Sequence, residues 1–175
     1  RKPFKTQIPW KKTFVFFGDE RFVPPTHKDS NFGLARKLLF SKVPLPRGHI
    51  FAMETDAPSP EQAAKNYAVR LRRFFRGRKV LFDLAILGMG ADGHTASLFP
   101  DSPLDKTKRW TAGFEKGRIS LTFTALNSSR RQVVLISGKD KIALIKRLLE
   151  SPRKILPVQN LRPRRGRLLI LGAYQ

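Results

Sequence analysis

The sequence predicts an α/β fold of three layers, α/β/α, built on a mostly parallel sheet. Segments with the apolar pattern of strands alternate along the chain with segments of helical pattern. The stretch over 80–87 is almost continuously apolar, as in a parallel strand that is covered on both faces. The 175 residues, 41% of them hydrophobic, suit one domain over 1–175 with its own core.

The first predicted strand covers 13–17, which is rich in β-branched and aromatic residues, and it ends at the charged cluster 19–21. Ser30 is then expected to cap a helix that runs to about Phe40. The residues expected to face the core from this helix are Ala35, Leu38 and Leu39. Prolines break the chain after it, and a short strand is expected near 50–53.

The second helix has the clearest start signal in the chain. Ser59 stands at the capping position, Pro60 at the first helical position and Gln62 at the third, which together predict a capping box. Its apolar stripe at helical spacing comprises Ala64, Tyr67, Ala68, Leu71 and Phe75. Gly77 is expected to end the helix.

The second half of the chain continues the alternation. Strands are predicted over 80–87, 118–123, 132–136 and 167–171, and a helix over 141–150. Residues 1–9 are expected to form a polar leader, and 161–167 a basic segment. No internal repeat is evident in the sequence.

A glycine-rich loop over 88–100 follows the apolar strand and carries Asp92 and His94 two residues apart, where a catalytic base is expected. Gly88, Gly90 and Gly93 also match the G-x-G-x-x-G pattern of dinucleotide sites, which requires a helix to open at the third glycine. Pro100 argues against such a helix.

Charged and polar clusters follow three of the predicted strands, at 19–21, 92–94 and 137–141. In open parallel sheets the loops at the carboxyl ends of the strands converge on one crevice, where ligands bind. We therefore expect these three clusters to meet in one active site.

Composition excludes several classes of protein. The chain has no cysteine, and its three histidines lack metal-ligand spacing, so neither a disulfide nor a metal cofactor is expected. No apolar run is long enough to cross a membrane and no secretory signal is seen, so we expect a soluble, intracellular protein. The net charge of +22 exceeds what a small anionic substrate needs, and it predicts attraction to polyanions.

Two motifs resemble the family of 6-phosphogluconolactonases and glucosamine-6-phosphate isomerases. They are Gly-Asp-Glu-Arg-Phe-Val-Pro over 18–24, followed by Asp-Ser-Asn at 29–31, and the loop over 88–100. Supporting similarity lies in 118–122 and 137–141. The ending Thr-Ala-Ser-Leu-Phe-Pro over 95–100 resembles the lactonase branch rather than the deaminase branch. The resemblance extends from about Trp10 onward and implies a Rossmann-like fold.

This resemblance implies hydrolysis of 6-phospho-D-glucono-1,5-lactone in the pentose phosphate pathway, without metal or organic cofactor. His94 is then the general base that activates water, and Asp92 orients it. The backbone amides of 90–93 are expected to polarise the lactone carbonyl. The residues expected to bind the substrate are Asp19, Glu20, Arg21, Gly90, Gly93, Arg118 and Lys141.

The family begins with a strand and a Ser-Gly-Gly type loop that cradles the phosphate, and nothing before Trp10 resembles it, so the fold is expected to be N-terminally truncated relative to the family. This difference and the charge of +22 keep a second interpretation open: a catalytically impaired subunit reused to bind RNA, for example in a mitochondrial ribosome. The cytoplasm is expected for an enzyme, and the mitochondrion for the ribosomal alternative. The candidate RNA-binding residues are Arg70, Arg72, Arg73, Arg76, Arg78, Lys79, Arg162, Arg164 and Arg165.

Overall fold

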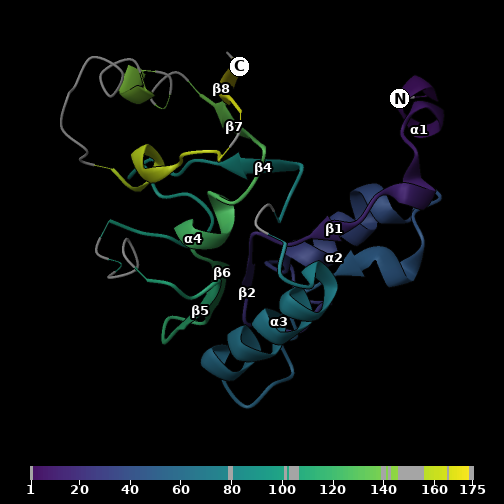
Figure 1. The fold of residues 1–175 in the computed structure, drawn as a ribbon, viewed down its shortest axis with the longest axis horizontal. Helices are drawn as coiled ribbons and strands as arrows, with labels where there is room; N and C mark the ends of the chain where they lie inside the picture. The colour runs from purple at the N-terminus through teal and green to yellow at the C-terminus, as the bar shows by residue number, and fades with distance from the viewer. Residues whose placement is uncertain are drawn as a thin grey trace.

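The computed structural model describes residues 2–78, 81–100, 102, 107–138, 141, 143–145, 156–164 and 166–173, with the backbone alone for 2–4 and 173. Figure 1 shows the course of the chain. The helices and helical turns are α1 (Lys2–Gln7), η1 (Trp10–Lys12), α2 (Asn31–Ala35), η2 (Arg36–Phe40), η3 (Arg47–His49), α3 (Pro60–Phe75), α4 (Phe123–Leu126) and η4 (Pro157–Asn160). The strands are β1 (Val15–Phe16), β2 (Asp19–Arg21), β3 (Ile50–Phe51), β4 (Leu84–Gly88), β5 (Thr111–Phe114), β6 (Arg118–Leu121), β7 (Arg131–Ser137) and β8 (Leu168–Ala173).

The strands form three sheets rather than one. Two are parallel, with orders β1-β3 and β4-β7-β8, and the third is antiparallel, with order β2-β6-β5. The prediction of an α/β fold is confirmed, whereas a mostly parallel sheet is only part of the architecture. The charged cluster at 19–21, predicted as a loop, is strand β2, because it pairs with the distant strand β6, which leaves no local signal.

Helix α3 forms as its cap signal predicts. The Ser59 hydroxyl oxygen accepts the Gln62 backbone N–H at 3.1 Å, while the Gln62 side chain donates to Asn66 at 2.9 Å instead of returning to Ser59, so only half of the capping box is made. The predicted apolar stripe is buried along its whole length. The helix ends at Phe75 and the chain turns at Arg76 and Gly77, both of which have positive φ.

The core lies between α3, the antiparallel sheet and the inner face of the β4-β7-β8 sheet. Tyr67 joins α3 to the β1-β3 sheet: its hydroxyl accepts the Phe17 N–H at 3.0 Å and donates to the Phe51 carbonyl at 3.1 Å. Burial raises the pKa of this hydroxyl, so it remains a neutral hydrogen-bonding group. This link sets β1, and the strand β2 after it, against the core.

The helix predicted from Ser30 to Phe40 is divided into α2 and the π-helical turn η2. Ser30 caps it as expected, since its hydroxyl accepts the Gly33 N–H at 3.0 Å. Ala35 packs against the core, but Leu38 and Leu39 are 56% and 40% exposed, so the prediction that they face inward is wrong. The change to π geometry rotates the last turn relative to a regular helix.

The β4-β7-β8 sheet is covered on one face only within the described part of the chain. Leu87, Val134 and Ile136 are buried on the inner face, whereas Leu84 and Ile86 on the opposite face of β4 are largely exposed. The expectation that the apolar strand over 80–87 is covered on both faces is therefore wrong for the outer face. Of the helix predicted over 141–150, residues 141 and 143–145 are helical and the others lie outside the described residues.

Candidate active site

The loop after β4 is shaped by its glycines. The Gly90 N–H donates to the His94 carbonyl at 2.9 Å and the Gly93 N–H to the Gly90 carbonyl at 3.1 Å, which closes a tight turn. Gly93 has φ of 76°, a conformation that disfavours any side chain. From Met89 to Pro100 the chain forms turns and no helix, so the helix that a dinucleotide site would need at Gly93 is missing.

Asp92 and His94 form a pair inside this turn. Asp92 Oδ1 lies 2.5 Å from His94 Nδ1 and also accepts the His94 backbone N–H at 3.1 Å. Burial opposes ionisation of Asp92, but the hydrogen bonds and the charge from His94 outweigh it and lower the pKa of the carboxyl. Asp92 is therefore a carboxylate at neutral pH.

This contact determines the tautomer of His94. A carboxylate accepts hydrogen bonds and has no proton to donate, so Nδ1 carries the proton and Nε2 keeps its lone pair. The Phe99 ring packs against the imidazole with the centroids 4.6 Å apart, which restrains the ring further. The arrangement presents an oriented base at Nε2.

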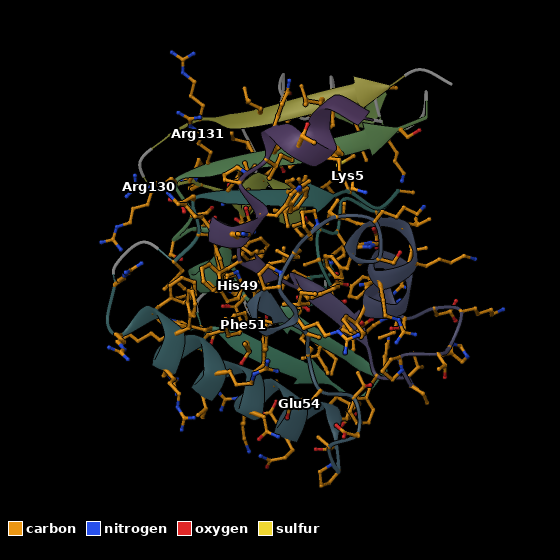
Figure 2. All side chains as sticks on the ribbon, turned by 90° about the vertical axis from the view of Figure 1, so that its right-hand side faces the viewer. Lys5, His49, Phe51, Glu54, Arg130 and Arg131 are labelled. Atoms are coloured by element: carbon orange, nitrogen blue, oxygen red, sulfur yellow. The ribbon has the colours of Figure 1, made fainter. Side chains whose placement is uncertain are left out.

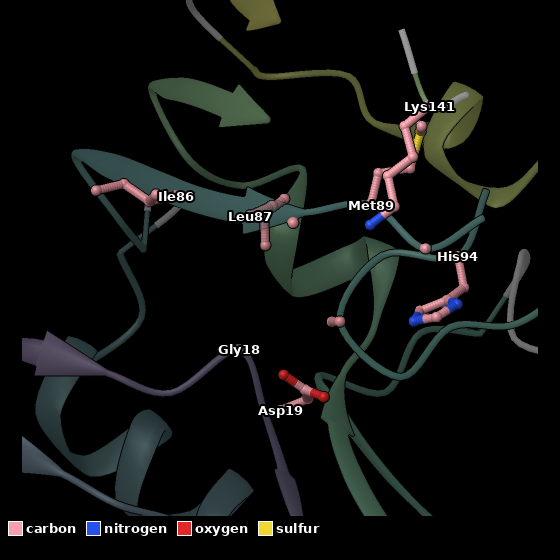
Figure 3. Close-up of a pocket in the computed structure, with 10 residues that line it drawn as sticks. Gly18, Asp19, Ile86, Leu87, Met89, His94 and Lys141 are labelled. Carbon is pink, nitrogen blue, oxygen red and sulfur yellow. The ribbon is translucent and has the colours of Figure 1, made fainter. Parts of the chain in front are cut away.

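A pocket of about 400 Å³ opens beside the histidine, a volume typical of small-molecule sites. Figure 3 shows Asp19, His94 and Lys141 around it, from three segments far apart in the sequence. Gly90 also lines the pocket. The three clusters at 19–21, 92–94 and 137–141 were expected to meet in one site, and each of them contributes one residue to this pocket.

Asp19 is held in place by side chains that the sequence reasoning did not assign to the site. Its Oδ2 accepts the hydroxyl proton of the buried Ser97 at 2.8 Å, and its Oδ1 accepts the Asn31 amide at 3.3 Å. The Ser97 N–H donates in turn to Ser120 on β6 at 3.1 Å. Ser97 and Asn31 lie within the two family motifs, which was the only available signal for them.

Glu20 points away from the pocket, into the core, and is 1% exposed. Its carboxylate accepts three backbone N–H groups, those of Arg21 at 2.8 Å and of Asn31 and Phe32 at 2.7 Å. The Ser30 hydroxyl donates to it at 3.3 Å. These contacts join β2 to the start of α2. Glu20, which the sequence predicted to bind the substrate, therefore has contacts typical of a structural residue.

Arg21 and Arg118 are direct partners across the β2-β6 ladder, and Asp19 pairs with Ser120 two positions away. Because side chains alternate along a strand, both arginines lie on the same sheet face as Asp19. Arg21 donates to the Asp29 carbonyl at 2.6 Å, and its Nε is buried without a partner. Neither arginine lines the pocket itself, but both lie on the face that leads to it.

The two remaining glycine predictions have different outcomes. Gly93 lies outside the pocket lining and packs against Leu156, while its carbonyl accepts the Val158 N–H at 3.0 Å. The amides of Gly90 and Gly93 donate within the loop, so the expectation that these two amides polarise a substrate carbonyl is wrong. The turn needs them to close on itself.

Gly90 touches the Asp92–His94 pair directly. A Cβ at this position would come within 2.2 Å of the imidazole and 2.7 Å of Asp92 Oδ1. Since a side chain can move aside at a lower cost than backbone can, we expect Gly90→Ala to displace His94 from its contact with Asp92 and lower kcat by about 10- to 100-fold, with a change in unfolding free energy below about 1 kcal/mol. Thermal unfolding and turnover would be measured together.

Gly48→Ala is the matched control for this variant, because a Cβ there meets no atom within 4 Å and Gly48 lies outside the pocket. Equal activity in Gly90→Ala and Gly48→Ala would show that the position of the imidazole does not matter.

The basic residues proposed for RNA lie on two separate elements, α3 with its C-terminal turn and the segment after η4. Arg70 pairs with Glu54 at 3.3 Å and Arg72 lies over the Trp110 ring. The exposed members are Arg72, Arg73, Arg76, Arg78, Arg162 and Arg164, and Lys79 and Arg165 lie outside the described residues.

In the described part of the chain no three acidic or histidine side chains are grouped to hold a metal ion. No described helix is long and apolar enough to span a bilayer.

Several 6-phosphogluconolactonases are similar to this chain in sequence or in structure. A 6-phosphogluconolactonase of Homo sapiens is 38% identical over 161 residues, which cover 87% of this chain and 62% of the human protein. One of Synechocystis is 43% identical over 141 residues, covering 77% and 59%. The crystal structure of the 6-phosphogluconolactonase from Thermotoga maritima matches with a TM-score of 0.80 at 33% identity, covering 95% of this chain and 76% of that one.

This chain spans only about three fifths of the length of its human and Synechocystis relatives, 62% and 59%. The family described as glucosamine-6-phosphate isomerases/6-phosphogluconolactonase matches residues 1–170, and the chain belongs to this family.

Proposed function

We propose that the chain hydrolyses 6-phospho-D-glucono-1,5-lactone to 6-phosphogluconate, a reaction of the pentose phosphate pathway. The observation that carries this proposal is the Asp92–His94 pair, 2.5 Å apart, beside a pocket that also contains Asp19 and Lys141. The lactonase names of the human and Synechocystis relatives support it, as does the loop ending over 95–100, which resembles the lactonase branch. These relatives do not favour RNA binding or a ribosomal role, and we propose no second function.

The first step is attack by water on the lactone. The lone pair of His94 Nε2 takes a proton from water while the water oxygen bonds to the lactone carbonyl carbon, and the carbonyl electron pair moves onto its oxygen. Asp92 stabilises the imidazolium that forms, because its carboxylate already accepts the Nδ1 proton.

The second step breaks the ester bond. The tetrahedral intermediate re-forms its carbonyl and the bond from that carbon to the ring oxygen breaks. The His94 imidazolium returns its proton to the departing ring oxygen, which becomes a hydroxyl. The product is a carboxylic acid that ionises in water, and His94 is again neutral.

Lys141 is the group proposed to bind the substrate phosphate, since it lines the pocket with His94. Arg21 and Arg118 add positive charge on the sheet face next to Asp19, and guanidinium groups suit a phosphate because they offer paired donors. Asp19, held by Ser97 and Asn31, is placed to accept a hydroxyl of the sugar.

The proposal is tested by following lactone consumption with and without the purified chain, because the lactone also hydrolyses spontaneously. We expect a rate above the uncatalysed one that scales with protein concentration. A rate equal to the background at all concentrations would refute the lactonase proposal.

Lys141→Ala is expected to raise KM by about 10- to 100-fold, the loss of one charge-assisted hydrogen bond to phosphate. The kcat should change much less, because this contact is made equally before and during the reaction. Lys42→Ala, which removes the same charge from an exposed position, is the control. A fall in kcat at constant KM would instead place Lys141 at the reacting atoms.

A further inference from the structure

A second hollow, of about 260 Å³, lies between helix α3 and the start of strand β5. It shares no lining residue with the pocket that contains His94. Figure 2 shows α3 along the bottom of the view, with side chains that end in nitrogen reaching from it into solvent. We call this hollow the helix–strand groove. Its lining includes the charged residues Glu61, Lys65, Arg72 and Arg109 and the apolar residues Ala68 and Trp110.

Contacts between α3 and β5 hold the two walls of the helix–strand groove in place. The Thr111 hydroxyl donates to the Ala64 carbonyl at 2.7 Å, and the Gly113 N–H donates to the Glu61 carboxylate at 3.3 Å. Gly113 packs so closely on the first turn of α3 that a Cβ there would lie 2.3 Å from the backbone of Pro60 and Glu61. Because the helix is fixed against the strand in this way, the groove is formed before a ligand arrives, as in most small-molecule sites.

The apolar part of the groove contains a flat ring. Ala64 and Ala68, 1% and 7% exposed, carry only a methyl group and leave space beside the half-buried Trp110 ring. The guanidinium carbon of Arg72 lies 6.0 Å from the centroid of that ring. This distance is the outer limit of a cation–π contact and is well beyond the roughly 3.5–4 Å between two stacked planes. The exposed Arg72 side chain therefore leaves the tryptophan accessible to a flat aromatic ring.

The charged part of the groove is positive. Lys65, Arg72 and Arg109 line it with a single carboxylate, that of Glu61, so the ionised side chains of the lining carry a net charge of +2. Glu61 is already engaged, because it accepts from Arg109 at 3.2 Å and from the Gly113 N–H. Arg72 has no carboxylate partner in the described part of the chain. A phosphate monoester, with a charge of about −1.5 to −2 at neutral pH, complements this lining.

We propose that the helix–strand groove binds a nucleoside monophosphate, with the base stacked on Trp110 and the phosphate bound by Arg72. Bases stack on aromatic side chains whatever their identity, because every base has a flat π face. The guanidinium of Arg72 lies next to the ring and offers paired donors to a phosphate, while Lys65 adds positive charge. The volume of about 260 Å³ is at the lower end for ligand pockets, which favours one nucleotide over a dinucleotide.

Neither half of a nucleotide complements the groove alone. A sugar phosphate or inorganic phosphate meets the charge of Arg72 and leaves the Trp110 ring without a stacking partner. A nucleoside covers the ring and leaves the cations without a counter-charge. A ligand that carries both parts should therefore bind more tightly than either part, and this difference is measurable.

The test is a calorimetric titration of the whole chain with adenosine 5′-monophosphate, with inorganic phosphate and with adenosine. We expect the nucleotide to bind at least about tenfold more tightly than either fragment. It should also quench tryptophan fluorescence, because Trp110 is the more exposed of the two tryptophans. Arg72→Glu should weaken nucleotide binding at least about tenfold, since it replaces a phosphate donor with a like charge. Lactone turnover should stay unchanged, because Arg72 lies outside the pocket beside His94.

Arg73→Glu is the matched control, because it changes the net charge equally from the next position of α3, which is exposed and outside the groove. It should weaken nucleotide binding by less than about twofold. Equal weakening by both variants would overturn the proposal, since the net charge of +22 would then attract the anion without a site. Equal affinity for inorganic phosphate and the nucleotide would also overturn it, as would binding that Lys141→Ala abolishes and Arg72→Glu spares. The readout is binding, so its failure is separate from a failure of the lactonase proposal, which depends on turnover.

Discussion

Replacing His94 with alanine is expected to lower kcat for lactone hydrolysis by about 10²- to 10⁴-fold, the contribution of a positioned general base. The side chain is about one third exposed and makes its hydrogen bond within its own loop, so its loss should change the unfolding free energy by no more than about 1 kcal/mol. Initial rates, corrected for spontaneous hydrolysis, and thermal unfolding give the two numbers.

The chain contains a natural control for this variant. His27 and Asp29 form a second histidine–aspartate pair with the same spacing in sequence, 3.7 Å apart and more exposed than Asp92 and His94. It lies outside the pocket lining. His27→Ala should therefore leave kcat unchanged, and a comparable loss in both histidine variants would mean that the reaction is not localised at His94.

The Asp92→Asn variant tests whether the His94 imidazole must be oriented as well as present. The amide nitrogen is a donor, so the side chain can turn it toward Nδ1 and stabilise the tautomer with the proton on Nε2, which cannot act as the base. We expect an intermediate loss of kcat with KM nearly unchanged. Because the pKa of Asp92 lies below its usual value, this carboxyl stays ionised near neutral pH, and the loss of kcat in Asp92→Asn near neutral pH reflects the lost carboxylate rather than a change in its protonation.

The elements that were predictable from sequence are those with complete local signals. Helix α3 carries its cap at Ser59 and its stripe at a period of 3.6, and both are found in place. The loop after β4 was equally predictable, because the contact between Asp92 and His94 forms within a turn of five residues. Local chemistry determines both features.

The features that were not predictable depend on distant chain. Strand β2 has the composition of a loop, and it is a strand because β6, about a hundred residues later, pairs with it. The apolar sequence of β4 is typical of a strand that is covered on both faces. Covering the outer face takes a neighbouring element, and the described part of the chain does not provide one. The pattern of apolar residues shows which faces of a strand need to be covered, but it does not show whether another element covers them.

The candidate site shows the same division. The pair of Asp92 and His94 and its neighbour Gly90 were found from their loop, whereas Asp19 needs Ser97 from another loop to hold its carboxylate. Ala96, which lines the pocket, has a φ of 50°, and nothing in the identity of this residue predicts that conformation. Such a conformation in a residue with a Cβ is strained and persists only where the surrounding structure imposes it.

Glu20→Ala is expected to have the largest effect on stability, a loss of about 2–4 kcal/mol in unfolding free energy, because it leaves several partly or fully buried donors unsatisfied. For a chain of 175 residues this corresponds to a fall in Tm of roughly 5–15 °C. Glu20→Gln should lose less, since its amide oxygen in the place of Oε1 still accepts the N–H groups of Arg21 and Asn31, while its NH2 group faces the Phe32 N–H. Chemical and thermal unfolding of both variants provide the measurement.

Glu115→Ala, at an exposed turn, is the control and should shift the unfolding free energy by no more than about 0.5 kcal/mol. The Glu20 variants also decide between two roles for this residue. If the carboxylate binds substrate, Glu20→Gln keeps its stability and raises KM. If it joins β2 to α2, as its contacts with Asn31 and Phe32 indicate, stability falls first, and KM changes only as far as Asp19 moves with its strand.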